Sequence, residues 1–423
     1  MKRPVLAVTA ILIAGAILSG ACSSGGDAPD PQAAQGGGSD ARSDTPVTSL
    51  ANPTTTRSRE EGCQGVLGVQ TADSPSTTNA LGDVSPETNR TIPFSATWTG
   101  DHYLAVGQEK RGQDDHAITY TSKDGVSWQT GATGQAPGLG SGPMVTLGGR
   151  YFLVVGTSKI SGTVGSAMSN LFTSTDGANW TAVPESGIQE QYPEDSVSIA
   201  TNGRVLVGTD HSGHVFSSTD GRSWAKVLPK GNEDTNGAEL TANANGFVVI
   251  QVVSSSGSSD GGWALWYSAD GVNWEDAGAA NANLVLSSSS SRTPSLKNAE
   301  ATATQKQFVI AGTEVREGGN TNGVVWSSSD GRKWESTSEQ TDLPFTGPGA
   351  QSIDAVVGGP DFVIVHASIP NSNGKGVFAS RDLQKWAPIS LPVDPTSSGV
   401  VTAASGDGVL LLDSYGDKAA FCR

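Results

Sequence analysis

Residues that would point to common enzyme or nucleic-acid chemistry are scarce in this chain. The 423 residues include three cysteines and five histidines, and 26 lysines and arginines stand against 42 aspartates and glutamates. The sequence contains no glycine-rich nucleotide loop, no serine nucleophile elbow and no reactive-thiol motif. Its formal charge of -16 repels phosphate backbones, and no basic stripe offsets that charge, so we expect no nucleic-acid partner.

Long amphipathic helices and membrane-spanning apolar runs are also missing. The apolar run from Val5 to Leu18 follows Lys2 and Arg3, and it is shorter than the roughly 20 residues that a transmembrane helix needs. A positive start, a short apolar run and small residues are typical of a secretory signal. We therefore predict that residues 1–21 are a signal peptide, whose removal takes the charge from -16 to -18 by removing two basic residues.

Residues 22–62 contain mainly Ser, Gly, Asp, Pro, Thr, Ala and Gln. Such a segment cannot bury enough apolar surface to offset its ordering entropy, so we expect a flexible tether with a typical span of roughly 35 Å.

The stretch "LSGACSS" (18–24) resembles the lipobox of bacterial lipoproteins, although Ser19 occupies the position where that family usually has Leu. The resemblance implies that Cys22 is acylated, palmitate included, and that the lipid holds the chain on the outer side of a bacterial cell membrane. The alternative is a free-secretion signal with an incidental cysteine.

A short motif with Asp and Trp recurs six times, as "SKDGVSW" (122–128), "STDGANW" (174–180), "STDGRSW" (218–224), "SADGVNW" (268–274), "SSDGRKW" (328–334) and "SRDLQKW" (380–386). The tryptophans are 52, 44, 50, 60 and 52 residues apart. A period of about 50 residues without a helical pattern indicates a radial array of β-sheets.

An apolar run precedes each copy, as expected for a strand buried on both faces. These runs are residues 103–106, 151–155, 205–207, 247–250, 308–311 and 362–365, and a seventh, 409–412, has no motif after it. The number of motif tryptophans therefore indicates six repeat units, whereas the number of apolar runs indicates seven. We predict an all-β fold, a seven-bladed β-propeller over residues 63–423, with six blades as the alternative.

The positions of two cysteines favour seven blades over six. The last unit has strands around 400–404, 409–412 and 418–422 but no fourth strand, while "CQGVLGV" (63–69) is a strand without a unit. If residues 63–69 supply the missing strand, the two chain ends close the ring and Cys63 lies near Cys422. We predict a disulfide between them, as exported proteins permit.

The motif itself has a local explanation. Asp followed by Gly is a strong hairpin signal. The Asp carboxylate can accept hydrogen bonds from backbone N–H groups of its own turn, and the Trp ring can cover that turn. The copies resemble Asp boxes, also called BNR repeats, although Asp stands four places before Trp where the family has five. The resemblance implies turns distant from the ligand pocket, and hence structural roles for Asp124, Trp128, Asp176, Trp180, Asp220, Trp224, Asp270, Trp274, Asp330, Trp334, Asp382 and Trp386.

Asp boxes occur in sialidases, and "NRTIP" (89–93) resembles their Arg-Ile-Pro motif with one extra residue. In that alternative Arg90 binds the substrate carboxylate, Asp114 or Asp115 is the acid and Tyr415 is the nucleophile. The required arginine cluster and Tyr–Glu pair are not evident in the sequence, since Arg292 and Arg316 lie in loop-like segments.

Ligand contacts are more typical of the loops opposite the motif hairpins. The candidates there, besides Asp114, Asp115 and Tyr415, are Glu109, Arg111, His211, His214, Arg316 and His366. His211 and His214 lack a third partner for a metal, and "DTNG" (234–237) is only a fragment of a calcium loop. We expect no metal and no cofactor, and a monomer that binds a protein or glycan ligand without catalysis.

Cys22→Ala tests the lipid anchor. Without the acylated thiol, the protein is expected to leave the membrane fraction and appear in the soluble fraction, as measured by fractionation and immunoblotting. Ser23→Ala, next to it, is the matched control and is expected to stay with the membrane. Retention of the Cys22→Ala protein would contradict the anchor.

Overall fold

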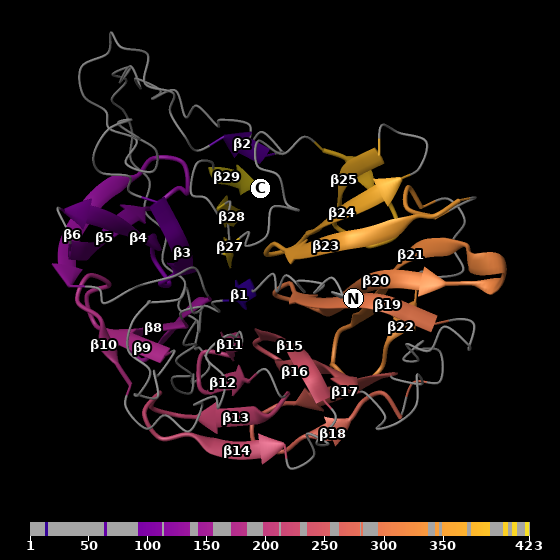
Figure 1. Ribbon diagram of the computed structural model, residues 1–423, viewed down its shortest axis with the longest axis horizontal. Helices are drawn as coiled ribbons and strands as arrows, with labels where there is room; N and C mark the ends of the chain where they lie inside the picture. Colours follow the sequence, from indigo (N-terminus) through magenta and orange to yellow (C-terminus); the bar gives the residue numbers. More distant parts are fainter. Residues whose placement is uncertain are drawn as a thin grey trace, which may run out of the picture.

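The computed structural model describes a β-rich chain (Figure 1). The described residues are 13–15, 63–65, 92–111, 114–135, 143–154, 171–183, 198–210, 213–228, 235–253, 262–279, 281, 295–336, 343–346, 349–369, 374–389, 401–404, 408–412 and 419–422. Over these ranges no helix has the length and apolar character needed to cross a membrane.

The described strands form six four-stranded sheets, numbered here in chain order, and one five-stranded terminal sheet. Sheets 1 and 2 contain β3 (Ile92–Trp98), β4 (Tyr103–Arg111), β5 (Asp114–Ser122) and β6 (Gln129–Gln135), then β7 (Met144–Leu147), β8 (Arg150–Val154), β9 (Leu171–Ser174) and β10 (Thr181–Ala182). Sheets 3 and 4 contain β11 (Ser198–Thr201), β12 (Leu206–Thr209), β13 (Val215–Ser218) and β14 (Ala225–Leu228), then β15 (Thr235–Asn243), β16 (Gly246–Val253), β17 (Gly262–Ser268) and β18 (Glu275–Asp276).

Sheets 5 and 6 contain β19 (Ser295–Ala303), β20 (Phe308–Val315), β21 (Thr321–Ser328) and β22 (Glu335–Ser336), then β23 (Ser352–Gly358), β24 (Val363–Ile369), β25 (Gly374–Ser380) and β26 (Ala387–Pro388). A short 3-10 helix, η1 (Glu317–Gly319), lies between β20 and β21. The terminal sheet has the order β1 (Ile13–Gly15), β27 (Val401–Ala404), β28 (Val409–Leu412), β29 (Ala419–Cys422) and β2 (Cys63–Gly65).

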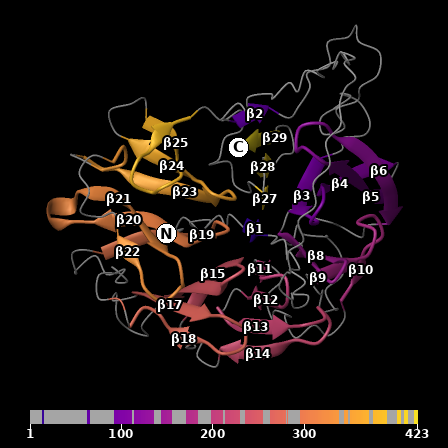
Figure 2. The ribbon, with the colours of Figure 1, turned by 180° about the vertical axis from the view of Figure 1, so that it is seen from behind.

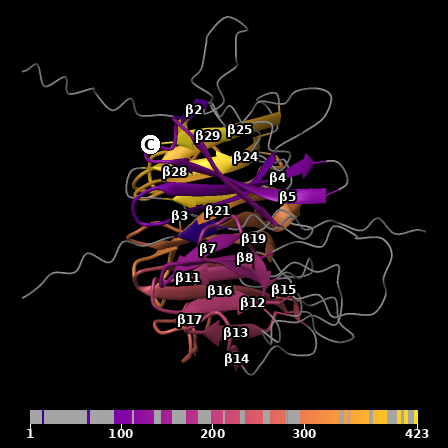
Figure 3. The same ribbon diagram turned by 90° about the vertical axis from the view of Figure 1, so that its left-hand side faces the viewer.

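The sheets are arranged radially around a common axis, with the first strand of each four-stranded sheet innermost (Figures 1 and 2). Seen from the side, the sheets together form a thick disc (Figure 3). Neighbouring strands within each four-stranded sheet are antiparallel, for example β15 with β16 and β16 with β17. The prediction of an all-β propeller is confirmed.

Each predicted apolar run overlaps the second strand of its unit, and the reason is burial on both faces. In β16, for example, Phe247, Val248, Val249 and Ile250 are at most 1% exposed. Successive side chains of a strand point to opposite faces, so such a run requires a neighbouring sheet on each side.

The core consists of apolar clusters between consecutive sheets rather than one central core. In the described residues seven such clusters occur, and one of them joins sheet 1 to the terminal sheet through Tyr103, Leu410 and Phe421. The Tyr103 hydroxyl donates a hydrogen bond of 3.2 Å to the carbonyl of Gly408, and its ring lies 5.6 Å from that of Phe421. The first and last parts of the propeller therefore pack directly against each other.

The two ends of the chain meet in the terminal sheet. Strand β2 pairs antiparallel with β29, and their register places Cys63 opposite Cys422. Strand β1 pairs in parallel with β27, with Ile13 opposite Thr402, near the axis of the disc (Figure 1). Residues 1–21, predicted to be a signal peptide outside the folded domain, thus contribute one strand to this sheet.

The six Asp–Trp motifs form hairpin turns between the third and fourth strands of sheets 1 to 6. In the first, Asp124 Oδ1 accepts hydrogen bonds from the N–H groups of Val126 (2.9 Å) and Ser127 (2.7 Å), and the Ser122 hydroxyl donates to it at 3.1 Å. The same three bonds occur in the other five copies.

The tryptophans of five motifs donate their indole N–H to a carbonyl of the same turn, while Trp274 Nε1 forms no hydrogen bond. The residue after Asp has a positive φ in all six turns, between 71° and 75° for the glycines and 58° for Leu383. Leu383 is 3% exposed, so its buried side chain stabilises a backbone conformation that glycine adopts more readily.

The motif glycines also set the distance between sheets. A Cβ atom on Gly125 would overlap Phe421 of the terminal sheet, on Gly221 it would overlap Phe152 of sheet 2, and on Gly331 it would overlap Tyr267 of sheet 4. Each turn therefore packs against a side chain of the preceding sheet.

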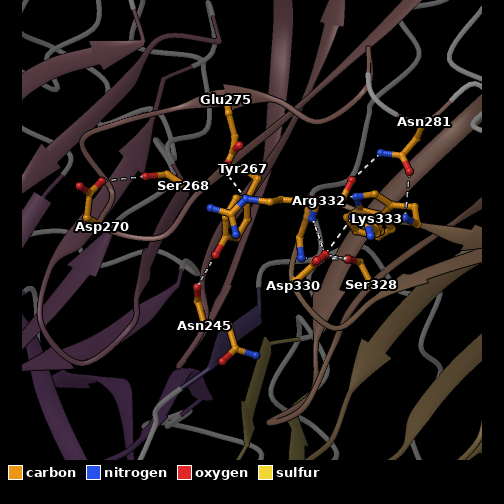
Figure 4. A network of polar contacts seen from close by, with 12 residues as sticks. Asn245, Tyr267, Ser268, Asp270, Glu275, Asn281, Ser328, Asp330, Arg332 and Lys333 are labelled. Carbon is orange, nitrogen blue, oxygen red and sulfur yellow. Dashed lines mark hydrogen bonds and ion pairs between the residues drawn. The ribbon is translucent and has the colours of Figure 1, made fainter.

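A polar network reinforces this packing between sheets 4 and 5 (Figure 4). The Arg332 guanidinium lies 4.4 Å above the Tyr267 ring and 2.7 Å from Glu275 Oε1. The Tyr267 hydroxyl donates to the carbonyl of Asn245 at 2.6 Å. Asn281 bridges the same sheets, donating to the carbonyls of Ala277 and Arg332 at 2.6 Å.

Substituting Gly221 with Ala is expected to lower the free energy of unfolding by about 2 to 4 kcal/mol, because a strained φ and a collision with Phe152 add. Gly149→Ala is the matched control, since Gly149 has a φ of 75° with nothing within 4 Å of its Cβ position. It should cost only about 1 kcal/mol for the backbone strain. Equal losses in urea unfolding would contradict the packing role.

Candidate functional site

Four predicted loop residues lie instead on paired strands, which corrects the expected long loop at 107–116. Strand β4 extends to Arg111 and β5 begins at Asp114, with Arg111 opposite Asp114 and Glu109 opposite His116. Asp115 stands opposite Lys110. The hairpin ladder therefore continues through residues that composition alone assigned to a loop.

His214 is held by a buried carboxylate. Asp210, which is 8% exposed, accepts from the His214 backbone N–H at 2.8 Å and lies 2.8 Å from its Nδ1. Gln251 of β16 donates to the carbonyl of Gly213 and accepts from Trp266 Nε1 at 2.8 Å, which fixes this turn on sheet 4. No three His, Cys, Asp or Glu side chains are grouped to hold a metal anywhere in the described ranges.

The other candidates are scattered. Arg316 follows β20, and its Nε lies 2.9 Å from Glu314 Oε2. His366, expected in a loop, lies within β24 and is 4% exposed, because β24 stays paired with β25 as far as Ile369. Thr235–Gly237 of the "DTNG" segment lie in β15, not in a calcium loop. Cys22, Arg90, His211 and Tyr415 lie outside the described residues.

Three carboxylates that the sequence reasoning did not select lie on neighbouring inner strands. Glu239 of β15 and Glu300 of β19 occupy equivalent positions of their ladders, whereas Asp354 lies at the irregularity of β23 between Ile353 and Ala355. Strand β15 contacts β19, and β19 contacts β23. The three side chains therefore form one row near the axis, named here the inner carboxylate row.

The environment of the two glutamates favours their protonated forms. Burial raises the pKa of Glu239 well above its ordinary value, and the charge of Glu300 adds to that rise. Burial also raises the pKa of Glu300 to about 8, opposed by a hydrogen bond of 3.1 Å from the Val356 N–H and increased by the charge of Asp354. Both glutamates thus hold protons at a pH where exposed carboxyls do not.

Asp354 differs because it has several donors. Burial raises its pKa, but contacts with His366, Ser368 and Ser352 outweigh burial and hold that pKa below the ordinary value. Ser368 and Ser352 donate to the carboxylate at 2.6 and 2.7 Å, and His366 Nδ1 lies 3.4 Å from its Oδ2. One end of the row is therefore ionised while the glutamates retain protons.

A signal for this row is present in the sequence. The segments "GAELTAN", "NAEATAT" and "SIDAVVG" each place one acid among small and apolar residues shortly before an apolar run. A search for function in polar loops misses such positions, because an isolated acid in a strand stands out only after the repeats are aligned.

The protonated glutamate predicts a pH dependence of stability. Glu300 loses its proton near 4.5 when unfolded and near 8 when folded, so the folded state binds more protons between these values. Its contribution to the free energy of unfolding is present below pH 4.5 and is lost as the pH rises through about 8. Glu300→Gln is expected to flatten urea-unfolding stability between pH 5 and 8 in a chain that retains residues 13–15, because β1 contacts β15 and β19 and so contributes to the enclosure of this carboxyl.

Glu335→Gln, on the exposed outer strand β22, is the matched control and should keep the wild-type slope. A wild-type slope in the Glu300→Gln protein would contradict the assignment of this proton.

Comparison with known proteins gives distant structural neighbours and one family match. No curated protein matches the chain. A GH74 xyloglucanase from Xanthomonas campestris is 14% identical with a TM-score of 0.45, covering 77% of this chain and 51% of that chain, so the present chain spans about half its length. A polysaccharide lyase is 9% identical with a TM-score of 0.47, covering 78% of this chain and 89% of that chain. The beta-propeller domain of the Trilobed protease from Pyrococcus furiosus is 8% identical with a TM-score of 0.45, and the match covers 77% of this chain and 89% of that domain.

A protein family described as the DUF6242 beta propeller domain matches residues 135–364, which is more than half of the chain. The matched region extends from the end of β6 into β24 and includes all of sheets 2 to 5. With this match and its radial four-stranded sheets, the chain belongs to the DUF6242 beta propeller domain family.

Proposed function

We propose that this chain is a lipid-anchored bacterial lipoprotein, whose propeller serves outside the cell membrane as a monomeric, non-catalytic ligand-binding or protein scaffold. The observation that carries the scaffold role is the unbroken series of apolar clusters between consecutive sheets, including the one between sheet 1 and the terminal sheet. A body packed in this way presents its turns and inner strands in fixed positions. The lipobox-like sequence and the polar tether support its place at the membrane.

A ring of seven blades is part of the proposal. Removal of residues 1–21 as a signal peptide takes β1 away, which leaves the terminal sheet with the order β27, β28, β29, β2. That sheet then has four strands like the other six, and β2 becomes its outer strand. The chain ends would close the ring by antiparallel pairing, as propellers do to avoid open edges.

The six motif aspartates and tryptophans are proposed to serve the hairpins alone. The backbone N–H of Asn273 lowers the pKa of Asp270 to about 2, and further bonds from the same turn add to this effect. A carboxylate fully used by its own turn has little left to offer a ligand.

A sialidase-like hydrolase is the alternative and has less support. It requires arginines free to bind a carboxylate, whereas the Arg316 side chain already contacts Glu314. Hydrolysis of a sialyl substrate that either Asp114→Ala or Asp115→Ala abolishes would establish this alternative and end the non-catalytic proposal.

We propose that Cys63 and Cys422 form a disulfide across the β2–β29 pair. Peptide mapping without reductant should recover the two cysteines in one linked peptide. Cys63→Ser and Cys422→Ser are each expected to lower the midpoint of thermal unfolding, because the crosslink restrains a very long loop worth on the order of 5 kcal/mol. Reductant should lower the wild-type midpoint and leave both variants unchanged, and a free thiol at either position in the wild type would contradict the crosslink.

A further inference from the structure

The inner edge of the terminal sheet differs from the inner edges of the other six. In each four-stranded sheet the innermost strand ends the sheet, so within the described residues no further strand pairs with it on the axis side. In the terminal sheet β1 adds to the inner edge of β27. The two strands run in parallel, with Ala14 opposite Ala403 at the centre of the pair. One inner edge of the propeller therefore accepts an additional strand.

Strand β1 lies along the axis, among the inner strands of several sheets. Besides β27 it contacts β7, β11, β15 and β19, and it stands at the centre of the ring (Figures 1 and 2). Because inner strands surround this position, a single extended segment can reach the edge of β27, whereas the edge of a whole second sheet cannot. The position is therefore suited to one strand.

Removal of residues 1–21, which the proposed function includes, takes this partner strand away. The inner edge of β27 then carries backbone N–H and C=O groups without a strand partner. Such an edge is a template for another strand, and backbone polar groups away from water are costly to leave unpaired. The processed chain thus contains at its axis an edge of the kind that β1 occupies in the structure.

The sequences that meet at this edge indicate an uncharged partner. Strands β7, β11 and β27 contain no charged residue, and neither does the segment 11–18 that includes β1. A charged side chain brought to the axis would lose water without gaining an ion pair from these three strands. An apolar segment avoids that cost.

We propose that the inner edge of β27 binds an extended, uncharged and apolar segment of a partner protein, which joins the terminal sheet as a parallel strand. In recognition by strand addition, main-chain hydrogen bonds supply affinity and the surrounding side chains supply selectivity. The inference rests on the proposed function, because that function supplies the processed chain. It gives the binding role a place in the fold and a class of partner.

The probe is a fluorescent peptide with the sequence of residues 11–17, Ile-Leu-Ile-Ala-Gly-Ala-Ile, extended by two lysines for solubility. Its fluorescence anisotropy is measured with increasing amounts of the detergent-extracted protein at about 0.15 M salt. The intact mass of that protein first shows whether residues 1–21 are absent. Saturable binding by the processed chain is expected.

Two N-methylated peptides test whether the main chain makes the contact. One is methylated at the nitrogens of Ile13 and Gly15, and the other at those of Ala14 and Ala16. Neighbouring residues of a strand direct their N–H groups to opposite sides, so only one of the two sets faces β27. One peptide is expected to bind at least roughly tenfold more weakly, and the other is expected to bind like the parent peptide. Both carry the same number of methyl groups, which controls for uptake by the detergent.

Hydrogen exchange measured by mass spectrometry locates the bound peptide. The amides of β27 are expected to exchange more slowly in the complex. Strand β14 is the matched control, because it also has four residues and ends its own sheet at the outer side. Its exchange is expected to stay the same.

Equal binding of the two N-methylated peptides, or slower exchange at β14 in place of β27, would overturn the strand addition. Failure of the processed chain to bind the parent peptide would overturn the site and leave the anchored scaffold standing. An extracted chain that still carries residues 1–21 would instead contradict the signal peptide of the proposed function, and the site with it.

Discussion

The structure depends on the burial of each sheet between its two neighbours. The second strand of each unit is apolar on both faces, and no isolated sheet can keep both faces from water. The turns set the spacing, because motif glycines such as Gly221 and Gly331 lie against side chains of the preceding sheet. The cluster of Tyr103, Leu410 and Phe421 extends the same contact to the first and last units, so each sheet contributes to the stability of the next.

Local signals predicted this architecture well because each has a local cause. The third strands of sheets 1 to 6 end at the motif serine, as at Ser122 and Ser328, where hydrogen bonds of one turn fix the boundary. The pairing of residues 63–65 with residues 420–422 was also predictable, since one unit lacked a strand and one strand lacked a unit. Such predictions need only short-range bonding and a count of strands.

Sequence reasoning was wrong where pairing between strands decides the outcome. Residues 107–116 look polar enough for a loop, yet Arg111 and Asp114 continue the β4–β5 ladder. His366 looks like the first residue of a loop, but β24 continues past it and its side chain is buried. The inner carboxylate row was missed for a related reason, because its meaning arises only when three distant segments become neighbouring inner strands.

The pKa of an acidic residue in this protein is lowered or raised according to the number of hydrogen-bond donors that its carboxylate meets. A motif aspartate such as Asp270 is exposed and accepts several N–H groups of one turn, which favours the charged form and lowers its pKa to about 2. Glu300 has one donor in a more enclosed place, so burial dominates and the neutral form is favoured. The hairpins therefore contribute permanent negative charge at the surface, whereas Glu300 becomes charged only as the pH rises toward about 8.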